Sequence, residues 1–339
     1  MSNIRIVLVY QYQEIIILVD LIYLMSQRPC NKCHNGLSVF YRSYSGEYLC
    51  KKCFLQSIEE KAAKTMSKFS MLDYNDRVAV AVSGGKDSLA LLFVMKKIFE
   101  KHYRSDIIAI TIDEGIEGYR NESLQIVKEF CSDLKIESKI LSYKNLFGID
   151  MDKAMMTRPS DKMTSCSMCG TFRRRAIDLA AESVGANIIA TAHNLDDQLQ
   201  TFAINLFAGD IERIAWIYPE PVQYGSNGLK KIKPFVEIYE HEIAFYALQR
   251  NIPFQSEECP YMHESIRTDI REFLNKLEKG HPGIKYNTYN SILKISKSMK
   301  SVSLIHTPKK CSVCGRDSTG DICSVCRTVD ILTSNNSVS

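Results

Sequence analysis

The segment Arg77–Ser88, with the sequence RVAVAVSGGKDS, determines the expected fold because an apolar run passes directly into a glycine turn. Residues 77–82 predict a short buried strand, and Ser88–His102 has the periodicity of a helix. Two glycines let backbone N–H groups approach an oxyanion, and the N-terminus of the following helix favours negative charge. The segment therefore predicts a phosphate-binding loop, although not a Walker A loop, because Lys86 is followed by Asp87.

Strands and helices alternate along the chain after this loop. Further strands are expected at Ile107–Asp113, Ile136–Leu141 and Asn187–Ala192. Helical periodicity over Glu122–Leu134 and Arg173–Val184 separates them. This alternation predicts an α/β fold built on a doubly wound parallel sheet, in which ligands bind beyond the carboxyl ends of the strands.

Polar residues follow two of these strands. Asp113 ends the second strand, where a carboxylate can bind a ribose or cap the next turn. The fourth strand is followed by His193, Asn194, Leu195, Asp196 and Asp197. Paired aspartates at a strand end suit Mg²⁺ coordination, but capping of the following helix explains either aspartate alone equally well.

The composition is that of a soluble globular protein with basic charge concentrated near its C-terminus. The 339 residues predict about two domains, and 45% hydrophobic with 24% charged residues excludes collagen-like, wholly disordered and multi-span membrane proteins. The net charge is +4, yet residues 279–316 contain eight basic and no acidic residues. Lys294, Lys297 and Lys300 fall near one helical face, and Tyr286 and Tyr289 are candidates for stacking on bases. A nucleic-acid surface is expected, with a solvated basic helix as the alternative.

Eight of the 12 cysteines form two sets with paired C-x2-C spacing. The sets are Cys30, Cys33, Cys50 and Cys53, and Cys311, Cys314, Cys323 and Cys326. Four thiolates complete the closed tetrahedral shell of structural zinc, so two Zn²⁺ sites without a catalytic role are expected.

Three further cysteines cannot close a zinc shell. Cys166 and Cys169 form a lone C-x2-C pair, and Cys259 lies in the segment EECPY. They can hold three corners of a cuboidal iron–sulfur cluster, act as a redox pair, or serve as a persulfide carrier with a resolving thiol. The residues alone leave these three alternatives open. Cys131 is expected to be a buried core cysteine.

The N-terminal 25 residues are uncertain as part of the fold. Ile4–Leu24 is apolar but interrupted by charges, and no cleavage site follows it. Met25 directly precedes the first cysteine set, so translation is expected to start there, with an extra strand or a peripheral anchor as the alternative. Without a secretion signal, a reducing cytoplasmic compartment is expected.

Together these segments resemble a known family. The resemblance is to the tRNA 2-thiouridine synthetases of archaea and the eukaryotic cytosol, within the PP-loop ATP pyrophosphatases. It extends from about Cys30 to Val329 and rests on SGGKDS, IDEGIEGYR, SCSMCGTFRRRA, ATAHNLDD and EECPY, flanked by the cysteine sets. IDEGIEGYR and CGTFRR resemble the branch that modifies the wobble uridine, position 34, more than the branch that modifies position 54.

The resemblance implies the cofactors and the residues that bind them. The implied ATP-binding residues are Ala81, Val82, Ser83, Gly84, Gly85, Lys86, Asp87, Ser88, Ile112, Asp113, Arg173, Thr191 and Asp196. The implied ligands of a 4Fe-4S cluster are Cys166, Cys169 and Cys259. Catalytic roles fall to Lys86, which stabilises developing charge, and to Arg173, which steadies the phosphates or the adenylate. Asp87 and Asp196 are expected to position Mg²⁺ and ATP.

The implied reaction is ATP-dependent thiolation of tRNA by a sulfurtransferase. ATP adenylates C2 of the uridine, pyrophosphate is released, and sulfur from the cluster replaces the oxygen to give 2-thiouridine. The expected partners are tRNA and a sulfur donor, either a ubiquitin-like thiocarboxylate protein or sulfide; no membrane partner is expected, and a homodimer is left open. The alternatives are a persulfide-based enzyme, thiolation at position 54, an amide-forming PP-loop synthetase and a non-catalytic tRNA-binding scaffold.

The expected domain organisation follows from these assignments. Residues 1–25 form the uncertain extension, 26–68 the first zinc module, and 69–251 the ATP-binding catalytic domain. A basic helical segment at 252–305 precedes the second zinc module at 306–332, and residues 333–339 form a disordered tail.

Overall fold

The computed structural model describes residues 28–102, 107–159, 163–221, 223–224, 228–261, 266–300 and 309–334. The apolar stretch Ile4–Leu24 and the last five residues lie outside these ranges. Within them, no helix is long and apolar enough to cross a membrane. The chain divides into two compact units, Met1–Ile58 and Glu59–Ser339.

The first unit is built around a small antiparallel hairpin. Strands β1 (Phe40–Arg42) and β2 (Glu47–Leu49) pair with Phe40 opposite Leu49, and helix α2 (Lys51–Lys68) begins directly afterwards. Phe40 and Phe54 place their ring centroids 4.4 Å apart. A two-stranded hairpin is marginal by itself, so this unit needs a further source of stability.

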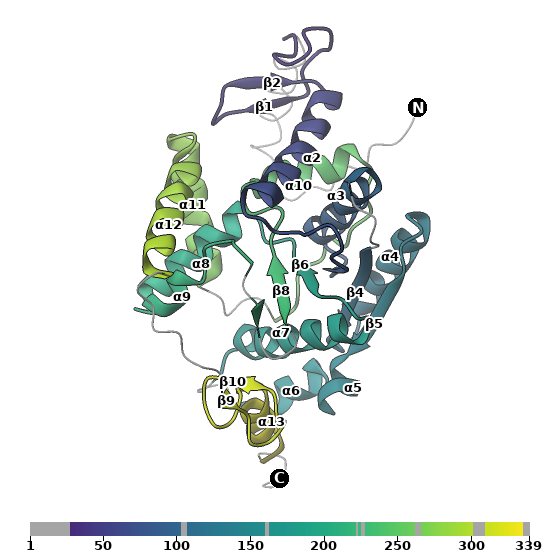
Figure 1. Cartoon of the computed structure of the whole chain (residues 1–339), viewed down its shortest axis with the longest axis vertical. Coiled ribbons are helices and arrows are strands. Elements are labelled where there is room, and N and C mark those ends of the chain that lie inside the picture. Colours follow the sequence, from purple (N-terminus) through teal and green to yellow (C-terminus); the bar gives the residue numbers. More distant parts are fainter. Residues whose placement is uncertain are drawn as a thin grey trace. The chain divides into compact units, whose positions relative to one another are not determined.

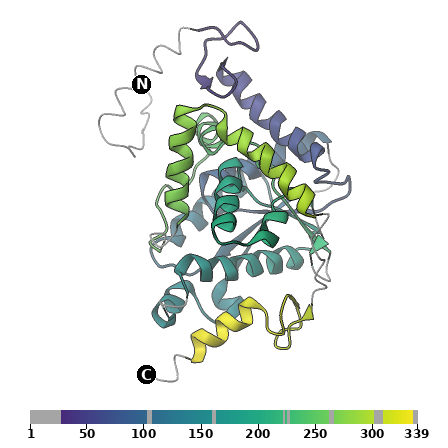
Figure 2. The ribbon, with the colours of Figure 1, turned by 90° about the vertical axis from the view of Figure 1, so that its left-hand side faces the viewer.

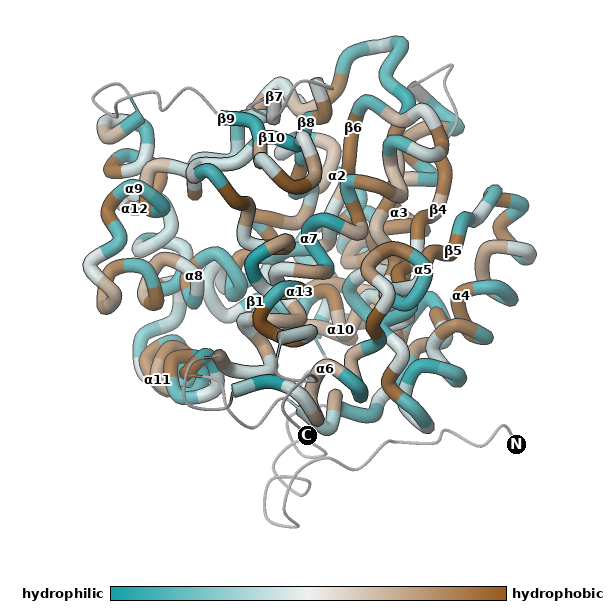
Figure 3. Tube along the Cα trace, turned by 90° about the horizontal axis from the view of Figure 1, so that it is seen from below, coloured by the Kyte–Doolittle hydropathy of each residue, from teal (hydrophilic) through white to brown (hydrophobic). Residues whose placement is uncertain are grey.

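The second unit contains the predicted parallel sheet. Its strand order is β5-β4-β3-β6-β8-β7, and only the edge strand β7 runs antiparallel. The strands are β3 (Val78–Ala81), β4 (Ile107–Asp113), β5 (Ser138–Ser142), β6 (Ile188–Ala190), β7 (Gln223–Tyr224) and β8 (Leu229–Ile232). The four expected strands are all present near their expected bounds, and the α/β fold is confirmed. The central strands β4 and β6 are hydrophobic along the trace, as burial on both faces requires (Figure 3).

Helices cover both faces of this sheet (Figure 1). The helices before the C-terminal basic segment are α3 (Lys86–His102), α4 (Arg120–Asp133), α5 (Tyr143–Phe147), α6 (Met151–Thr157), α7 (Ser165–Ser183), α8 (Leu195–Phe207), α9 (Ile211–Ala215) and α10 (Glu240–Gln249). Helix α7 begins eight residues earlier than expected, because Thr164 caps it by accepting the N–H of Ser167 at 3.3 Å. The C-x2-C pair therefore lies in the first turns of a helix.

The C-terminal cysteine module shares a hydrophobic core with α7. Helix α13 (Ser324–Ser334) follows the hairpin of β9 (Lys309–Lys310) and β10 (Asp317–Ser318). Residues of this module and of α7 belong to one buried cluster: Cys311, Cys323, Val325 and Leu332 with Met168, Phe172 and Ala176. Arg316 also binds Glu182 of α7 through two N–H···O bonds of 2.8 and 2.9 Å. The module is thus packed onto the helix that carries the C-x2-C pair (Figure 1).

The basic segment forms two helices, α11 (Arg267–Gly280) and α12 (Ile284–Lys300), that pack against α8 (Figure 2). Lys294 and Lys297 are exposed on α12, as expected for a charged surface. Tyr289 is fully buried, so the prediction that it stacks on bases is wrong. Lys285 is buried as well, which removes it from the basic surface.

Candidate active site

The phosphate-binding loop lies at the carboxyl end of β3. Gly84 has φ +90°, and a Cβ there would lie 2.6 Å from the Cβ of Ser123, so only glycine fits. Ser88 fixes the loop from the next helix: its hydroxyl donates to the Gly85 carbonyl at 2.9 Å and accepts the Ser83 N–H at 3.1 Å. Helix α3 begins at Lys86, so its unpaired N-terminal N–H groups adjoin the loop. This arrangement fits a phosphate group.

Lys86 and Asp87 are connected to a third residue that sequence reasoning did not identify. Lys86 Nζ lies 3.2 Å from Asp87 Oδ2 and 2.8 Å from Glu240 Oε1. Burial alone would lower the pKa of Lys86, but the two carboxylates outweigh burial and raise it. Burial raises the pKa of Asp87 to about 6, with Lys86 opposing the shift and Glu240 and Asp197 adding to it. Lys86 therefore keeps its charge, and Asp87 is mostly ionised at neutral pH but becomes protonated as the pH falls through about 6.

The segment after β6 forms the opposite side of the site. The Thr191 N–H donates to the Ile232 carbonyl at 3.0 Å, and its hydroxyl lies 2.9 Å from His193 Nδ1. Asn194 and Asp197 form a capping box at the start of α8, with reciprocal bonds of 3.0 and 3.1 Å. Burial raises the pKa of Asp197, although the backbone N–H of Asn194 opposes the shift.

Asp196 lies in a different environment from Asp197. It is buried, it accepts the N–H of Glu240 at 2.8 Å, and its other oxygen binds Lys285 of α12. The predicted Mg²⁺ and ATP residue therefore already has partners on both oxygens. Asp196 is linked to the phosphate loop through Glu240, whose backbone N–H binds Asp196 and whose carboxylate pairs with Lys86.

The loop after β4 brings two buried charged residues to the same sheet edge. Asp113 caps its own turn by accepting the Gly115 N–H at 2.9 Å. Arg120 donates to the carbonyls of Ser83 at 2.9 Å and Ile112 at 2.6 Å. The side chains of Val82 and Ile112 are buried, which leaves them only backbone atoms to offer ATP, and Ala81 is half-buried. Arg120 Nε also lies 2.7 Å from Glu114 Oε2.

Arg173 connects this loop to the C-x2-C pair. Its Nη2 lies 3.0 Å from Glu114 Oε1 and donates to Cys169 Sγ at 3.4 Å. Burial would lower the pKa of Arg173, but Glu114, Cys169 and Tyr143 together raise it, so the guanidinium stays charged. Tyr143, the first residue of α5, donates to the Cys169 carbonyl at 3.0 Å.

The three remaining predicted site cysteines come together near Tyr261. Ser165 Oγ donates to the Tyr261 carbonyl at 2.8 Å, and Cys166 Sγ lies 3.9 Å from the same oxygen. Cys169 and Cys259 pack against one hydrophobic cluster. Burial raises the pKa of Cys259; the Tyr261 N–H opposes the shift, and the neighbouring Cys169 and Cys166 add to it.

The spacing of these three sulfurs differs from that of the four-cysteine sets. Among the described residues, only the two four-cysteine sets gather all their sulfurs within 4.8 Å of one another. A cuboidal cluster binds each cysteine to a different iron, so its cysteine sulfurs stand farther apart than those around a single ion. Three convergent thiols without a fourth fit such a cluster.

Three basic side chains lie near His193. Burial lowers the pKa of His193 to about 3, and Lys233, Arg267 and Arg173 add to the shift. Burial also lowers the pKa of Lys233 to about 8, with Asp197 opposing the shift. Sequence reasoning missed Lys233 because it missed β8, although a residue directly after a strand of a parallel sheet is where a site residue is expected.

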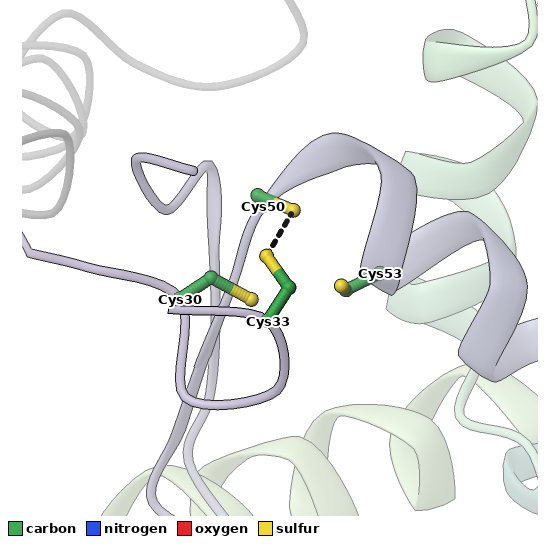
Figure 4. A group of neighbouring side chains, drawn as sticks. All are labelled: Cys30, Cys33, Cys50 and Cys53. Atoms are coloured by element: carbon green, nitrogen blue, oxygen red, sulfur yellow. Dashed lines mark hydrogen bonds between the residues drawn. The ribbon is translucent and has the colours of Figure 1, made fainter. Parts of the chain in front are cut away.

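The two four-cysteine sets are assembled as their spacing predicts. In the first unit the sulfurs of Cys30, Cys33, Cys50 and Cys53 face one another at the start of α2 (Figure 4). Cys33 and Cys50 place their sulfurs 3.8 Å apart, as do Cys314 and Cys323 in the second unit. That separation matches the edge of a tetrahedron with Zn–S bonds of about 2.3 Å, about 3.8 Å, and far exceeds a disulfide bond of about 2.05 Å. Backbone N–H groups of Cys323 and Cys314 lower the pKa of Cys311 to about 6, which favours the thiolate that binds metal.

Comparison with known proteins agrees with this geometry. A family model described as a PP-loop domain matches residues 55–278. Cytoplasmic tRNA 2-thiolation protein 1 of Aspergillus niger is 34% identical over 317 residues, covering 92% of this chain and 90% of that protein. The chain belongs to the tRNA 2-thiolation family of PP-loop proteins. The family resemblance drawn from the sequence is confirmed.

Archaeal members of the tRNA 2-thiolation family are equally similar. The tRNA 2-thiolation protein NcsA of Haloferax volcanii is 31% identical over 319 residues, covering 89% of this chain and 98% of that protein. Among solved structures, the U34-tRNA thiolase NcsA from Methanococcus maripaludis, with its 4Fe-4S cluster, is 31% identical with a TM-score of 0.75. The match covers 88% of this chain and 95% of that one, so the similarity extends well beyond the residues matched by the PP-loop domain model.

Proposed function

We propose that this chain is a cytoplasmic tRNA sulfurtransferase that uses ATP to convert the wobble uridine, position 34, to 2-thiouridine. One observation carries the proposal: an unbroken series of side-chain contacts runs from Ser83 in the phosphate loop through Arg120, Glu114 and Arg173 to Cys169. Activation by ATP and delivery of sulfur must act on the same carbon atom. The contact series supports the proposal because it joins the phosphate loop to Cys169 at one edge of the sheet.

The phosphate loop would bind ATP and stabilise the charge that develops as pyrophosphate leaves. The N–H groups at the start of α3 and the Lys86 ammonium supply positive potential there. The uridine C2 oxygen attacks the α-phosphorus, the bond to the β-phosphate oxygen breaks, and pyrophosphate departs. Arg173 lies between the loop and the cysteines and would steady the adenylate through its exposed edge, with half of its side chain accessible.

Mg²⁺ would be held by carboxylates near the phosphate loop. Asp197 lies close enough to Asp87 to add to the rise in the pKa of Asp87, and Asp197 is oriented by Asn194. Asp196 has partners on both oxygens, so its contribution to ATP binding would come through Glu240 and Lys86. Mg²⁺ would neutralise the part of the negative charge of the ATP phosphates that the phosphate loop leaves uncompensated.

Cys166, Cys169 and Cys259 would hold a 4Fe-4S cluster, and the two four-cysteine sets would hold structural Zn²⁺. When bound, the cluster supplies a free iron position at which sulfur is made available to the uridine. The chain's own residues keep the site charged and oriented: Arg173 contacts the Cys169 sulfur, and Tyr143 fixes the Cys169 carbonyl. The sulfur would come from a ubiquitin-like thiocarboxylate protein or from sulfide.

The experiment that tests this function compares two substitutions in anaerobically purified protein. Cys259→Ala is expected to lose iron and tRNA thiolation together while keeping ATP binding, because the phosphate loop contains no cysteine. Asp87→Ala is expected to keep its iron while losing tRNA-dependent pyrophosphate release. Cys131→Ala is the matched control, since Cys131 is a buried cysteine of α4 outside the site.

Two experimental outcomes would contradict the proposed function. Full thiolation by protein that contains no iron would favour a persulfide on Cys166 or Cys169. Normal iron content and normal thiolation in Cys259→Ala would show that Cys259 is only a core residue. Thiolation is read by mass spectrometry of the nucleosides from a tRNA transcript, which also identifies the modified position.

A further inference from the structure

We propose that Glu114 and Arg120 are positioning residues that hold the Arg173 guanidinium between the phosphate loop and Cys169. This inference rests on the proposed function and adds two residues to its machinery. Neither residue is expected to contact ATP or tRNA, because both are almost completely buried, with 3% and 4% of their surface exposed. Their effect on the reaction would therefore pass through Arg173 and through the backbone of the loop.

Arg120 connects the carboxyl ends of two neighbouring strands. It donates one N–H to the carbonyl of Ser83, two residues after β3, and another to the Ile112 carbonyl in β4. A planar guanidinium can donate to two carbonyls in a fixed geometry while its charge pairs with a carboxylate, which a lysine ammonium does with less geometric control. Arg120 thus couples the position of the phosphate loop to that of Glu114.

Glu114 lies between two guanidinium groups. One of its oxygens is 2.7 Å from Arg120 Nε, and the other is 3.0 Å from Arg173 Nη2 and accepts from Arg173 Nε at 3.1 Å. Burying a carboxylate and an arginine costs desolvation energy, and a buried ion pair adds little net stability over apolar residues. Such a pair at the edge of a reaction site is better explained by the orientation it imposes.

The orientation matters because Arg173 contacts Cys169 through the same nitrogen that Glu114 holds. Its side chain is half exposed, and its Nη2, which lies 3.0 Å from Glu114 Oε1, donates to the Cys169 sulfur at 3.4 Å. An arginine side chain has several rotatable bonds, so without Glu114 its guanidinium is free to leave this position. A displacement of about 1 Å at a reacting centre can cost on the order of 100-fold in rate.

A double-mutant cycle tests whether Glu114 acts through Arg173. The variants are Glu114→Gln, Arg173→Ala and the double variant, with the exposed residue of the same loop, Glu117→Gln, as control. We expect Glu114→Gln to lower kcat for tRNA-dependent pyrophosphate release by about 10- to 100-fold, as a misplaced group does. In the Arg173→Ala background the same change is expected to cost less than about 2-fold, because a shared pathway makes the effects non-additive.

Further measurements separate positioning from folding. Iron content, the urea unfolding midpoint and the ATP dissociation constant of each variant are recorded beside kcat. Glu114→Asp keeps the charge but shortens the reach, so it is expected to fold and still to lose kcat; it replaces Glu114→Gln if the latter does not fold. Arg173→Lys retains one contact with Glu114 and is expected to restore part of the activity missing from Arg173→Ala.

Additivity would overturn the inference: an equal loss from Glu114→Gln with and without Arg173 means that Glu114 acts independently of it. A loss no larger than that of Glu117→Gln would overturn it as well. If the unmodified protein binds ATP but never thiolates tRNA, the proposed function fails and the cycle is evaluated on the ATP dissociation constant. If the effects of the Glu114 and Arg173 substitutions on the ATP dissociation constant are then simply additive, the positioning role is overturned independently of the proposed function.

Discussion

The ammonium group of Lys285 in α12 contacts a carboxylate oxygen of Asp196 in the first turn of α8, and both side chains are almost inaccessible, at 4% and 7%. The contact joins the basic helical segment to the loop that follows β6. Asp196 also orients Glu240, the partner of Lys86. Lys285, which the charge pattern of the sequence assigned to a basic surface, is therefore buried and pairs with Asp196 inside the protein.

Replacing Lys285 should reveal that role. Lys285→Met leaves the Asp196 carboxylate buried without its partner, and breaking such a pair costs about 3–5 kcal/mol of unfolding free energy. Lys294→Met, on the exposed side of the same helix, should change stability by less than about 0.5 kcal/mol. Urea unfolding measures both. Equal effects of the two substitutions would show that the Lys285 contact does not contribute to the fold.

The two glycines of the phosphate loop should respond differently to alanine. Gly84→Ala brings a Cβ to 2.6 Å from Ser123 in a left-handed backbone conformation, so a loss of about 1–3 kcal/mol is expected. At Gly85 the nearest atom to a new Cβ is Ser83 Oγ at 3.5 Å, so the free protein should retain its stability. Thermal unfolding with and without ATP distinguishes the two. A Gly84→Ala protein as stable as Gly85→Ala would contradict the strained geometry.

Deprotonation of Lys233 should weaken substrate binding at alkaline pH. Burial lowers its pKa from 10.5 to about 8, so its positive charge is lost as the pH rises through that value. Binding of ATP or tRNA should weaken above about pH 8, and Lys233→Arg should shift that limit upward because a guanidinium stays charged. The unfolded state binds more protons between pH 8 and 10.5, so this residue makes the folded state more stable as the pH rises across that range. A binding profile identical in both proteins would remove Lys233 from the site.

The exposed lysines of α12 should contribute to tRNA affinity by neutralising phosphates. Substituting Lys294 and Lys297 by alanine should reduce the salt dependence of tRNA binding by about one unit of slope for each phosphate that is no longer neutralised. Lys300 should contribute less, because it is 25% exposed and lies 3.6 Å from Glu220. Lys128→Ala, at an exposed position of α4, is the control, and ATP binding should stay unchanged throughout. An unaltered salt slope would favour a merely solvated helix.

Loss of a cysteine from the C-terminal set should destabilise the first turns of α7, whereas loss of one from the N-terminal set should not. Cys314→Ser removes one proposed zinc ligand from a module that shares its core with Met168 and Phe172. Amide exchange over the first turns of α7 should therefore accelerate in Cys314→Ser. Cys30→Ser, in the other compact unit, should leave that exchange unchanged. Equal acceleration in both variants would contradict this division.

Sequence reasoning succeeded where one local pattern determines one element. The run before Ser83 could only be a buried strand followed by a turn, and β4 was recovered with its full length of seven residues. Prediction from the sequence failed for β8, because polar residues within that strand interrupt the apolar pattern. Lys230 and Lys231 interrupt the apolar pattern of β8, which pairs with β6 through backbone groups that no side-chain pattern reveals.

Parts of the site depend on contacts between distant segments and could not be predicted. Glu240 reaches Lys86 from 154 positions away, and nothing near either residue indicates the pairing. Tyr289 was expected to contact RNA because aromatic residues beside lysines often do, but tertiary packing against neighbouring helices buries it. Glu114 and Arg120 lay within a recognised motif, yet their roles became visible only with the contacts of Arg173.

The position of β8 in the chain has a consequence for biosynthesis. Strand β6 pairs on one side with β3 and on the other with β8, whose first residue is Leu229. At roughly 5–20 residues per second, the ribosome needs about 2 to 8 seconds to synthesise the chain from Ala190, the last residue of β6, to Leu229. During this interval β6 remains an unpaired hydrophobic edge, the kind of surface that attracts other strands. Nascent chains stalled before Leu229 should therefore depend on ribosome-associated chaperones and aggregate in their absence.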